Sequence, residues 1–279
     1  MSFALALFLA QAGPLVSPGA GPALPTAPIG RRPGKQVAAP VLPTRLQECL
    51  ALAGTDPLAA VEVAEGWLNT VAGSAQADPH HCLGIAYNNL SHWSDAEAAF
   101  LAARDAAAAN ERGRKASLGA MAGLAALDQQ AFVRADAALL AAHTDALAAG
   151  KAELAGDIAI DRSRALVALK RESDAEAALA AGRNASPANP AGWLLSATLS
   201  RRQGKLAQAQ TQIERAAALM PFDPQIGLEA GVIAVLAGRD AAARNSWLSV
   251  IEASPGSSEA ATAKAYLDQL SPAPKPAGK

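Results

Sequence analysis

The sequence has few aromatic residues and no surplus of positive charge. Only 4% of its 279 residues are aromatic, although 51% are hydrophobic. It holds 24 basic and 25 acidic residues, for a formal net charge of −1. A chain without a basic surplus has little with which to neutralise phosphates, so nucleic acid is not an expected partner. Alanine supplies most of the hydrophobic fraction. It has the highest helix propensity, and its small side chain lets helices pack closely.

The chain also lacks an apolar run long enough to cross a membrane. The stretch MSFALALFLA at residues 1–10 is shorter than the roughly 20 residues that a spanning helix needs. The triplet Ala10-Gln11-Ala12 matches the small-residue pattern of a signal-peptide cleavage site. We therefore predict a signal peptide over residues 1–12 and an exported, periplasmic protein with no integral membrane segment in the mature chain. The alternative is a retained N-terminus that is buried or disordered.

Two segments have little apolar surface to bury. Residues 13–43 are rich in Pro, Gly and Ala, and residues 271–279 read SPAPKPAGK. Segments of this composition cannot offset the conformational entropy that folding removes. We therefore predict a disordered linker over 13–43 and a disordered tail over 271–279, which leaves residues 44–270 as the folded region.

No motif of an active site is present. There is no G-x-S-x-G, no phosphate-binding loop and no C-x-x-C. The string D-P-H-H-C at 78–82 contains three metal-ligand types, but adjacent helical residues point about 100° apart and cannot close on one ion. Asp78 as an N-cap and Pro79 as the first helical residue explain how the string begins. We expect no catalytic residue, no cofactor, no metal and no enzymatic activity.

One short segment occurs twice. S-D-A-E-A-A-F at 94–100 returns as S-D-A-E-A-A-L at 173–179. In each copy a serine is followed three residues later by a glutamate, the pattern of a capping box at a helix start. The predicted boxes are Ser94 with Glu97 and Ser173 with Glu176. The duplication therefore indicates repeated architecture rather than repeated chemistry.

A larger repeat has a period of 34 residues. Small residues that precede a large apolar residue by four recur at Ala175, Ala209 and Ala243. Prolines near the ends of the units keep the same step. They are Pro187, Pro221 and Pro255. A fixed period of this length, with two helices per unit, is typical of a helical solenoid.

These residues resemble the tetratricopeptide-repeat (TPR) pattern. L-G-I-A-Y at 83–87, followed by Ala96, Phe100 and Ala103, matches its spacing. The resemblance implies an all-α, right-handed superhelical solenoid of about six TPR-like helix pairs over 44–270, with a C-terminal capping helix. Further members are Gly54, Ala59 and Val63 in a degenerate first unit, Trp193, Ala209 and Ile213 in the fifth, Gly231, Ala243 and Trp247 in the sixth, and Ser257–Leu270 as the cap. Two middle units of 39 and 40 residues predict a lengthened helix or loop near Asn110 and Gly150.

In TPR proteins the first helix of each pair faces the concave surface and binds a partner. The resemblance therefore implies a non-enzymatic protein-protein interaction scaffold in the cell envelope that binds a protein or peptide. An accessory assembly or secretion factor that positions an enzyme partner is the alternative. The partner-binding residues carried over by position are Asn88, Asn89, Arg164, Leu194, Thr198, Arg201 and Arg202. Further inward positions include Leu127, Ile160, Leu228, Val232 and Val235, of which the last three are alternatively covered by the cap.

Three arginines of this surface suggest the chemistry of the partner. The planar fork of Arg164, Arg201 or Arg202 can hold a carboxylate bidentately. An acidic or carboxylate-bearing partner is therefore expected. Alternatively, the arginines pair with Asp157 and Asp161 and are merely solvated.

Only two cysteines are present. Cys49 and Cys82 fall in the first helices of successive predicted units. In an exported protein such a pair can form a disulfide. Two separate buried cysteines that act as small hydrophobes are the alternative.

The N-terminus gives a first prediction. If residues 1–12 are a signal peptide, the native mature chain begins near Gly13, because cleavage follows Ala12. Intact-mass measurement of the protein from its own cells checks this. A chain that keeps Met1 and fractionates with the cytosol would contradict export.

Overall fold

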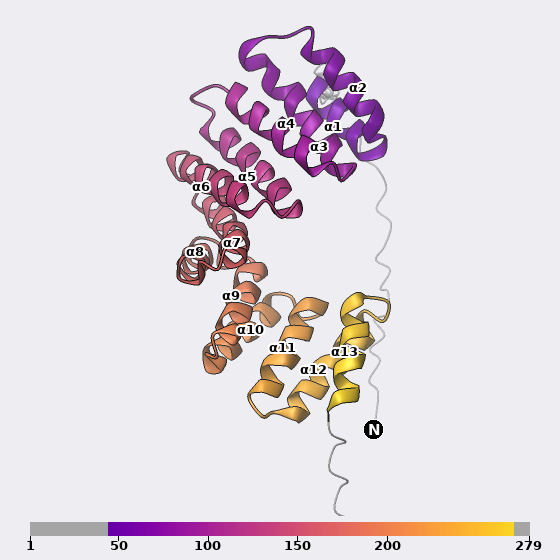
Figure 1. Cartoon of the computed structure of the whole chain (residues 1–279), viewed down its shortest axis with the longest axis vertical. Coiled ribbons are helices and arrows are strands. Elements are labelled where there is room, and N and C mark those ends of the chain that lie inside the picture. The colour runs from indigo at the N-terminus through magenta and orange to yellow at the C-terminus, as the bar shows by residue number, and fades with distance from the viewer. Residues whose placement is uncertain (1–43, 271–279) are drawn as a thin grey trace, which may run out of the picture. The chain divides into compact units, whose positions relative to one another are not determined.

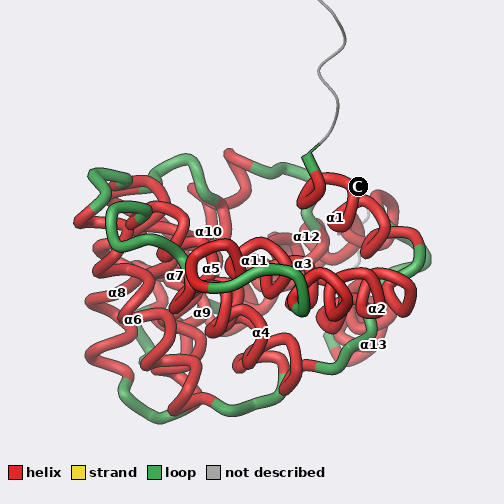
Figure 2. Tube along the Cα trace, turned by 90° about the horizontal axis from the view of Figure 1, so that it is seen from above, coloured by secondary structure: helices red, strands yellow, loops and turns green. Residues whose placement is uncertain are grey.

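Pairs of helices, stacked in chain order, make up the part of the protein that the structure describes (Figure 1). The computed structural model describes residues 44–270, and the predicted signal peptide, linker and tail lie outside this range. Within it are thirteen α-helices and a short 3-10 turn, and no strand (Figure 2). The predicted all-α repeat of six helix pairs and a capping helix is confirmed.

The six pairs are α1 with α2, α3 with α4, and so on to α11 with α12, and α13 is the cap. Their bounds are α1 Arg45–Thr55, α2 Pro57–Leu68, α3 Ala77–Asn89, α4 Trp93–Ala106, α5 Arg112–Asp128, α6 Phe132–Ala148, α7 Ala152–Ala168, α8 Glu172–Ala185, α9 Pro190–Arg202, α10 Leu206–Leu219, α11 Pro224–Leu236, α12 Asp240–Ala253 and α13 Ser258–Gln269, with the 3-10 turn at Gly73–Gln76. The helices that flank Asn110 and Gly150 are longer, as predicted: α5, α6 and α7 each have 17 residues. The second pair is not itself longer, with 13 residues in α3 and 14 in α4, because its extra residues lie in the connection to α5.

The first helices of most successive pairs also pack against one another. α1 contacts α3, α5 contacts α7, α7 contacts α9, α9 contacts α11, and α11 contacts the cap α13. Each second helix packs mainly against the first helix before it and the first helix after it. The first helices therefore share one face of the solenoid, which is the face that the TPR pattern assigns to binding.

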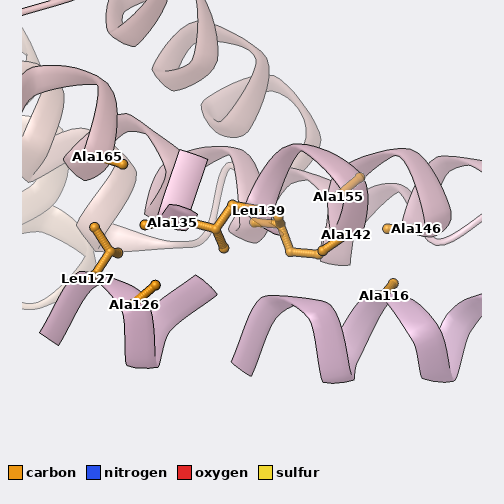
Figure 3. Close-up of a cluster of buried hydrophobic side chains, with 10 residues drawn as sticks. Ala116, Ala126, Leu127, Ala135, Leu139, Ala142, Ala146, Ala155 and Ala165 are labelled. Atoms are coloured by element: carbon orange, nitrogen blue, oxygen red, sulfur yellow. The ribbon is translucent and has the colours of Figure 1, made fainter. Parts of the chain in front are cut away.

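Close packing inside each pair depends on a small residue facing a large one. A Cβ added to Gly84, Gly123 or Gly231 would overlap a side chain sixteen residues later: Phe100, Leu139 or Trp247 respectively. These large residues are buried, and so is the alanine four residues before each of them. Figure 3 shows Leu139 among alanines of α5, α6 and α7. The predicted small-to-large pattern is confirmed for the second to sixth pairs.

The first pair has a different register from the predicted one. Ala60 and Ala64 are buried, whereas the expected Val63 is 44% exposed. The shift follows from the start of α2, where the carboxylate of Asp56 accepts a hydrogen bond from the amide of Ala59. Pro57 then occupies the first helical position, where its missing N–H costs nothing.

Both predicted capping boxes are wrong. α4 begins at Trp93 after His92, and α8 begins at Glu172 after Arg171, so Ser94 and Ser173 lie inside the first turns. The helices start early because a residue with positive φ sits two positions before each: Ser91 at 59° and Lys170 at 59°. That turn, rather than a serine cap, sets the start of the second helix.

The glutamates of the two copies bind the next pair instead. Glu97 accepts hydrogen bonds from Gln129 and Arg134, and Glu176 accepts from Lys205 at 3.2 Å. At the same place in later units, Asp136 accepts from Arg171 and Gln210 accepts from Arg239. The donors Arg171, Lys205 and Arg239 are 34 residues apart, so the period of the repeat marks this contact in the sequence.

The start of α3 also differs from the prediction. α3 begins at Ala77 after Gln76, so Asp78 and Pro79 are its second and third residues and Asp78 is not an N-cap. The preceding 3-10 turn brings the chain into helical geometry before Asp78 is reached. Asp78 forms an ion pair with Arg114 of α5.

The two cysteines are joined in the structure. A disulfide links Cys49 of α1 to Cys82 of α3, with the Cα atoms 6.0 Å apart. Native protein should therefore yield one bridged peptide and a mass two hydrogens below that of the reduced chain. Reduction should lower the free energy of unfolding by about 2–4 kcal/mol. The Cys49→Ala, Cys82→Ala double variant should not respond to reductant, and two free thiols in the native protein would contradict the bond.

Burial of the small residues gives a stability prediction. Ala209 of α10 is fully buried, whereas Ala207 in the same turn is exposed. Ala209→Asp should destabilise the protein by about 3 kcal/mol or more, because it buries a carboxylate without a partner. The control Ala207→Asp adds the same charge near the helix N-terminus, where it is tolerated. Equal urea midpoints for the two variants would show that the repeat register is wrong.

Candidate binding groove

Two adjoining hollows lie on the face that the first helices share. The first has a volume of 270 Å³ between α7 and α9, and the second has 380 Å³ and extends from α9 over α11 to α13. Leu195 and Thr198 of α9 line both of them. The hollows are therefore two compartments of one groove, which we call the α7–α11 groove.

Five of the seven predicted partner-binding residues line this groove. Arg164 and Arg202 line the first hollow, Leu194 and Arg201 line the second, and Thr198 lines both. They come together because α7 and α9 pack side by side and each contributes the same face.

The other two predicted residues lie elsewhere, on α3. Asn89 donates a hydrogen bond from its side-chain amide to the backbone carbonyl of Ala53, at 2.9 Å. That bond ties the end of α1 to α3. The structure brings neither Asn88 nor Asn89 to the groove.

Two further inward assignments are wrong. Leu127 is 7% exposed and Ile160 is 2% exposed, so neither is available to a partner. Ile160 is covered because Gly182 and Gly192 lie so close that a Cβ on either would meet its side chain. The absence of side chains at those two positions lets α8 and α9 close over it.

The three arginines of the groove have different partners. Arg201 donates to Glu229 of α11 at 2.6 Å, and both side chains are mostly buried. Arg202 lies 3.9 Å from Glu172, and Arg164 lies 4.0 Å from Asp161. The last two distances are longer than a hydrogen bond. Arg201 is therefore fixed by an internal ion pair, whereas Arg164 and Arg202 keep donors to offer.

Of the two carboxylates that the alternative interpretation assigns to these arginines, only Asp161 lies near one of them, Arg164. Asp157 accepts hydrogen bonds from Ser186 at 2.7 Å and Asn189 at 2.8 Å, so it is engaged with the α8–α9 turn. Burial raises the pKa of Asp161 to about 6; Arg164 opposes this rise and the charge of Asp157 adds to it. A carboxyl with this pKa is partly protonated in mildly acidic solution, which weakens its hold on Arg164.

The apolar residues at the C-terminal end are partly covered. Leu228, Val232 and Val235 of α11 are half-buried and belong to a cluster with Tyr266, Leu267 and Leu270. The capping helix thus covers part of each of these three side chains, as the alternative interpretation expects. Leu228 and Val232 still line the second hollow.

Residues 44–270 contain no group of three or more His, Cys, Asp or Glu side chains gathered as a metal site requires. Over the same range, no helix combines the length and apolar character needed to cross a membrane.

Comparison with known proteins first places the chain among all-α repeat solenoids. Neither a family model nor a curated protein sequence matches it. Solved structures do. The pilF protein of Pseudomonas aeruginosa matches at 17% identity and a TM-score of 0.62, covering 79% of this chain and 95% of that one. PilW, described as a widely conserved type IV pilus biogenesis factor, matches at 18% and 0.61, covering 79% and 99%.

A third similar structure specifies the fold. A tetratricopeptide repeat protein from Parabacteroides merdae matches at 12% identity and a TM-score of 0.63, covering 80% of this chain and 86% of that one. At such identities the likeness concerns the fold and not the function. The chain therefore has the tetratricopeptide-repeat fold, as its sequence pattern predicts.

Proposed function

We propose that the protein is a non-enzymatic scaffold that binds an acidic peptide or protein segment in the α7–α11 groove. One observation carries the proposal: Arg164 and Arg202 both line a hollow whose other walls include Val167, Leu195 and Leu199. Cationic donors beside apolar surface suit a partner that presents a carboxylate next to an apolar side chain.

The charge distribution favours Arg164 and Arg202 over Arg201 as the contacts. Arg201 already donates to Glu229, and a partner carboxylate would have to displace that side chain. Arg164 and Arg202 lose little when they turn to a partner, because their own carboxylates lie 4.0 and 3.9 Å away. In this proposal Arg201 shapes the groove by holding α9 to α11, and its two neighbours bind.

Two observations support a place in the cell envelope. The sequence begins with an apolar stretch and a small-residue cleavage pattern, which is typical of export. The cysteines lie close enough to be joined, and structural disulfides persist in oxidising compartments. We accordingly propose a periplasmic location.

A second candidate function is that of an accessory factor in envelope assembly or secretion, which positions an enzyme partner. It is favoured by the likeness to PilW, whose description is that of a pilus biogenesis factor. The two candidates differ in the partner and not in the groove.

The proposal predicts that Arg164→Ala with Arg202→Ala weakens partner binding about tenfold or more, because each charge-assisted contact contributes roughly 1.5–3 kcal/mol. A photoreactive residue at Thr198, which lines both hollows, would capture and identify the partner in cells. The affinity of the captured partner is then measured for the purified wild-type chain and for the double variant.

Two controls separate binding from folding and from general charge. Arg215→Ala with Lys264→Ala removes two exposed cations outside the groove and should leave the affinity unchanged. A photoreactive residue at the exposed Thr211 of α10 should not capture the same partner. Equal affinity of the wild type and the Arg164, Arg202 double variant would show that the partner binds elsewhere.

A further inference from the structure

A third hollow, of 370 Å³, lies between α11, α12 and the capping helix α13. Its walls are mostly apolar and aromatic: they include Val235, Leu236, Trp247 and Tyr266, and the one polar residue is Gln269. Trp247 is 3% exposed and lies 5.2 Å from Tyr266 between ring centroids, whereas Leu236 is 53% exposed. The hollow thus has a fixed aromatic wall and an apolar residue open to solvent.

The sequence of α11 shows that this surface is unusual. The helix reads PQIGLEAGVIAVL, and its second half is apolar on every side. A helix that is apolar all round is normally covered all round. Here Leu236 stays exposed at the end of the helix, because α13 covers only part of it.

The third hollow is continuous with the groove. Val232 and Tyr266 line both the third hollow and the second, just as Leu195 and Thr198 line both the second and the first. The charged lining changes along this path. The first hollow holds Arg164 and Arg202, the second holds Arg201, Glu229 and Glu259, and the third has no charged residue.

We infer that the third hollow is an anchor site for a large apolar or aromatic side chain of the same partner segment whose carboxylate binds Arg164 and Arg202. This inference rests on the proposed function and makes it more specific. The attraction between the partner's carboxylate and the two arginines places one end of the segment in the first hollow. The continuous groove leads from there to the aromatic wall of the third hollow. The partner is thus an extended segment with an acidic end and an apolar anchor.

The spacing of the two points can be estimated. Packed helices lie roughly 8–10 Å apart, and the first and third hollows are separated by two such steps, or about 18 Å. An extended chain advances about 3.3 Å per residue. The carboxylate and the anchor should therefore be about five or six residues apart.

The test uses labelled synthetic peptides that carry two glutamates, a Gly-Ser spacer of two to ten residues and one phenylalanine, in both chain directions. Fluorescence anisotropy with the full chain measures their affinity. We expect an optimum at a spacer of about five residues in one direction. Replacing the phenylalanine by alanine should weaken binding about tenfold or more, and this change leaves the protein untouched.

A matched pair of protein variants locates the anchor. Leu236→Asp puts a charge at the mouth of the third hollow, and Leu248→Asp puts one on α12 at a residue that is equally exposed, at 50%. Only the first should weaken binding, and it should have little further effect on the peptide that lacks phenylalanine.

Three outcomes would overturn the inference, and they are distinguishable. If Arg164→Ala with Arg202→Ala abolishes binding but Leu236→Asp does not change it, the proposed function stands and the anchor site does not. If neither change affects any peptide, both fail. If a chain that ends at Leu270 binds the peptide about tenfold more tightly than the full chain, the protein's own tail 271–279 is the occupant.

Discussion

The geometry of the solenoid depends on a contact between a small residue on one helix and a large residue sixteen positions later on the next. Gly84 faces Phe100, and Gly231 faces Trp247. Because glycine has no Cβ, the two helices approach closely. The far end of the large side chain can then pack outside its own pair. Phe100 lies in one buried cluster with Leu118 of the following pair. One side chain therefore determines packing within a pair and between pairs, and the shared face of the first helices follows from it.

The register of most pairs could be predicted because it depends on side-chain size, which a sequence shows directly. Ala209 and Ile213 are buried as their spacing predicts. The starts of the second helices could not be predicted in the same way. They depend on a backbone turn with positive φ, and at Ser91 and Lys170 that turn has no glycine to mark it. The serine and the glutamate have the spacing of a capping box, but they do not cap the helix. Glu97 instead accepts a hydrogen bond from the next pair.

The groove residues could be predicted for a related reason: position within the repeat decides which face a side chain occupies. Repeat position does not decide which charges pair. Arg201 and Glu229 are 28 residues apart, less than one period, and their contact depends on how far each side chain reaches across two helices. Ile160 is buried against the prediction because its exposure depends on Gly182 and Gly192, which lie on neighbouring helices. The position within the repeat predicts which face a residue lies on. Whether the residue is accessible to a partner depends on the side chains packed around it.

The same repeat thus uses charge in two ways. At the second helices, Asp136 of α6 accepts a hydrogen bond at 2.6 Å from Arg171, the residue before α8, and this contact joins one pair to the next. In the groove, Arg164 and Arg202 stand 4.0 and 3.9 Å from carboxylates and contribute little to stability at that range. A side chain whose donors are engaged at hydrogen-bond distance can bind a partner only by breaking an internal bond. Stacking is thereby stabilised by one set of charges, and the set that is weakly engaged remains available for recognition.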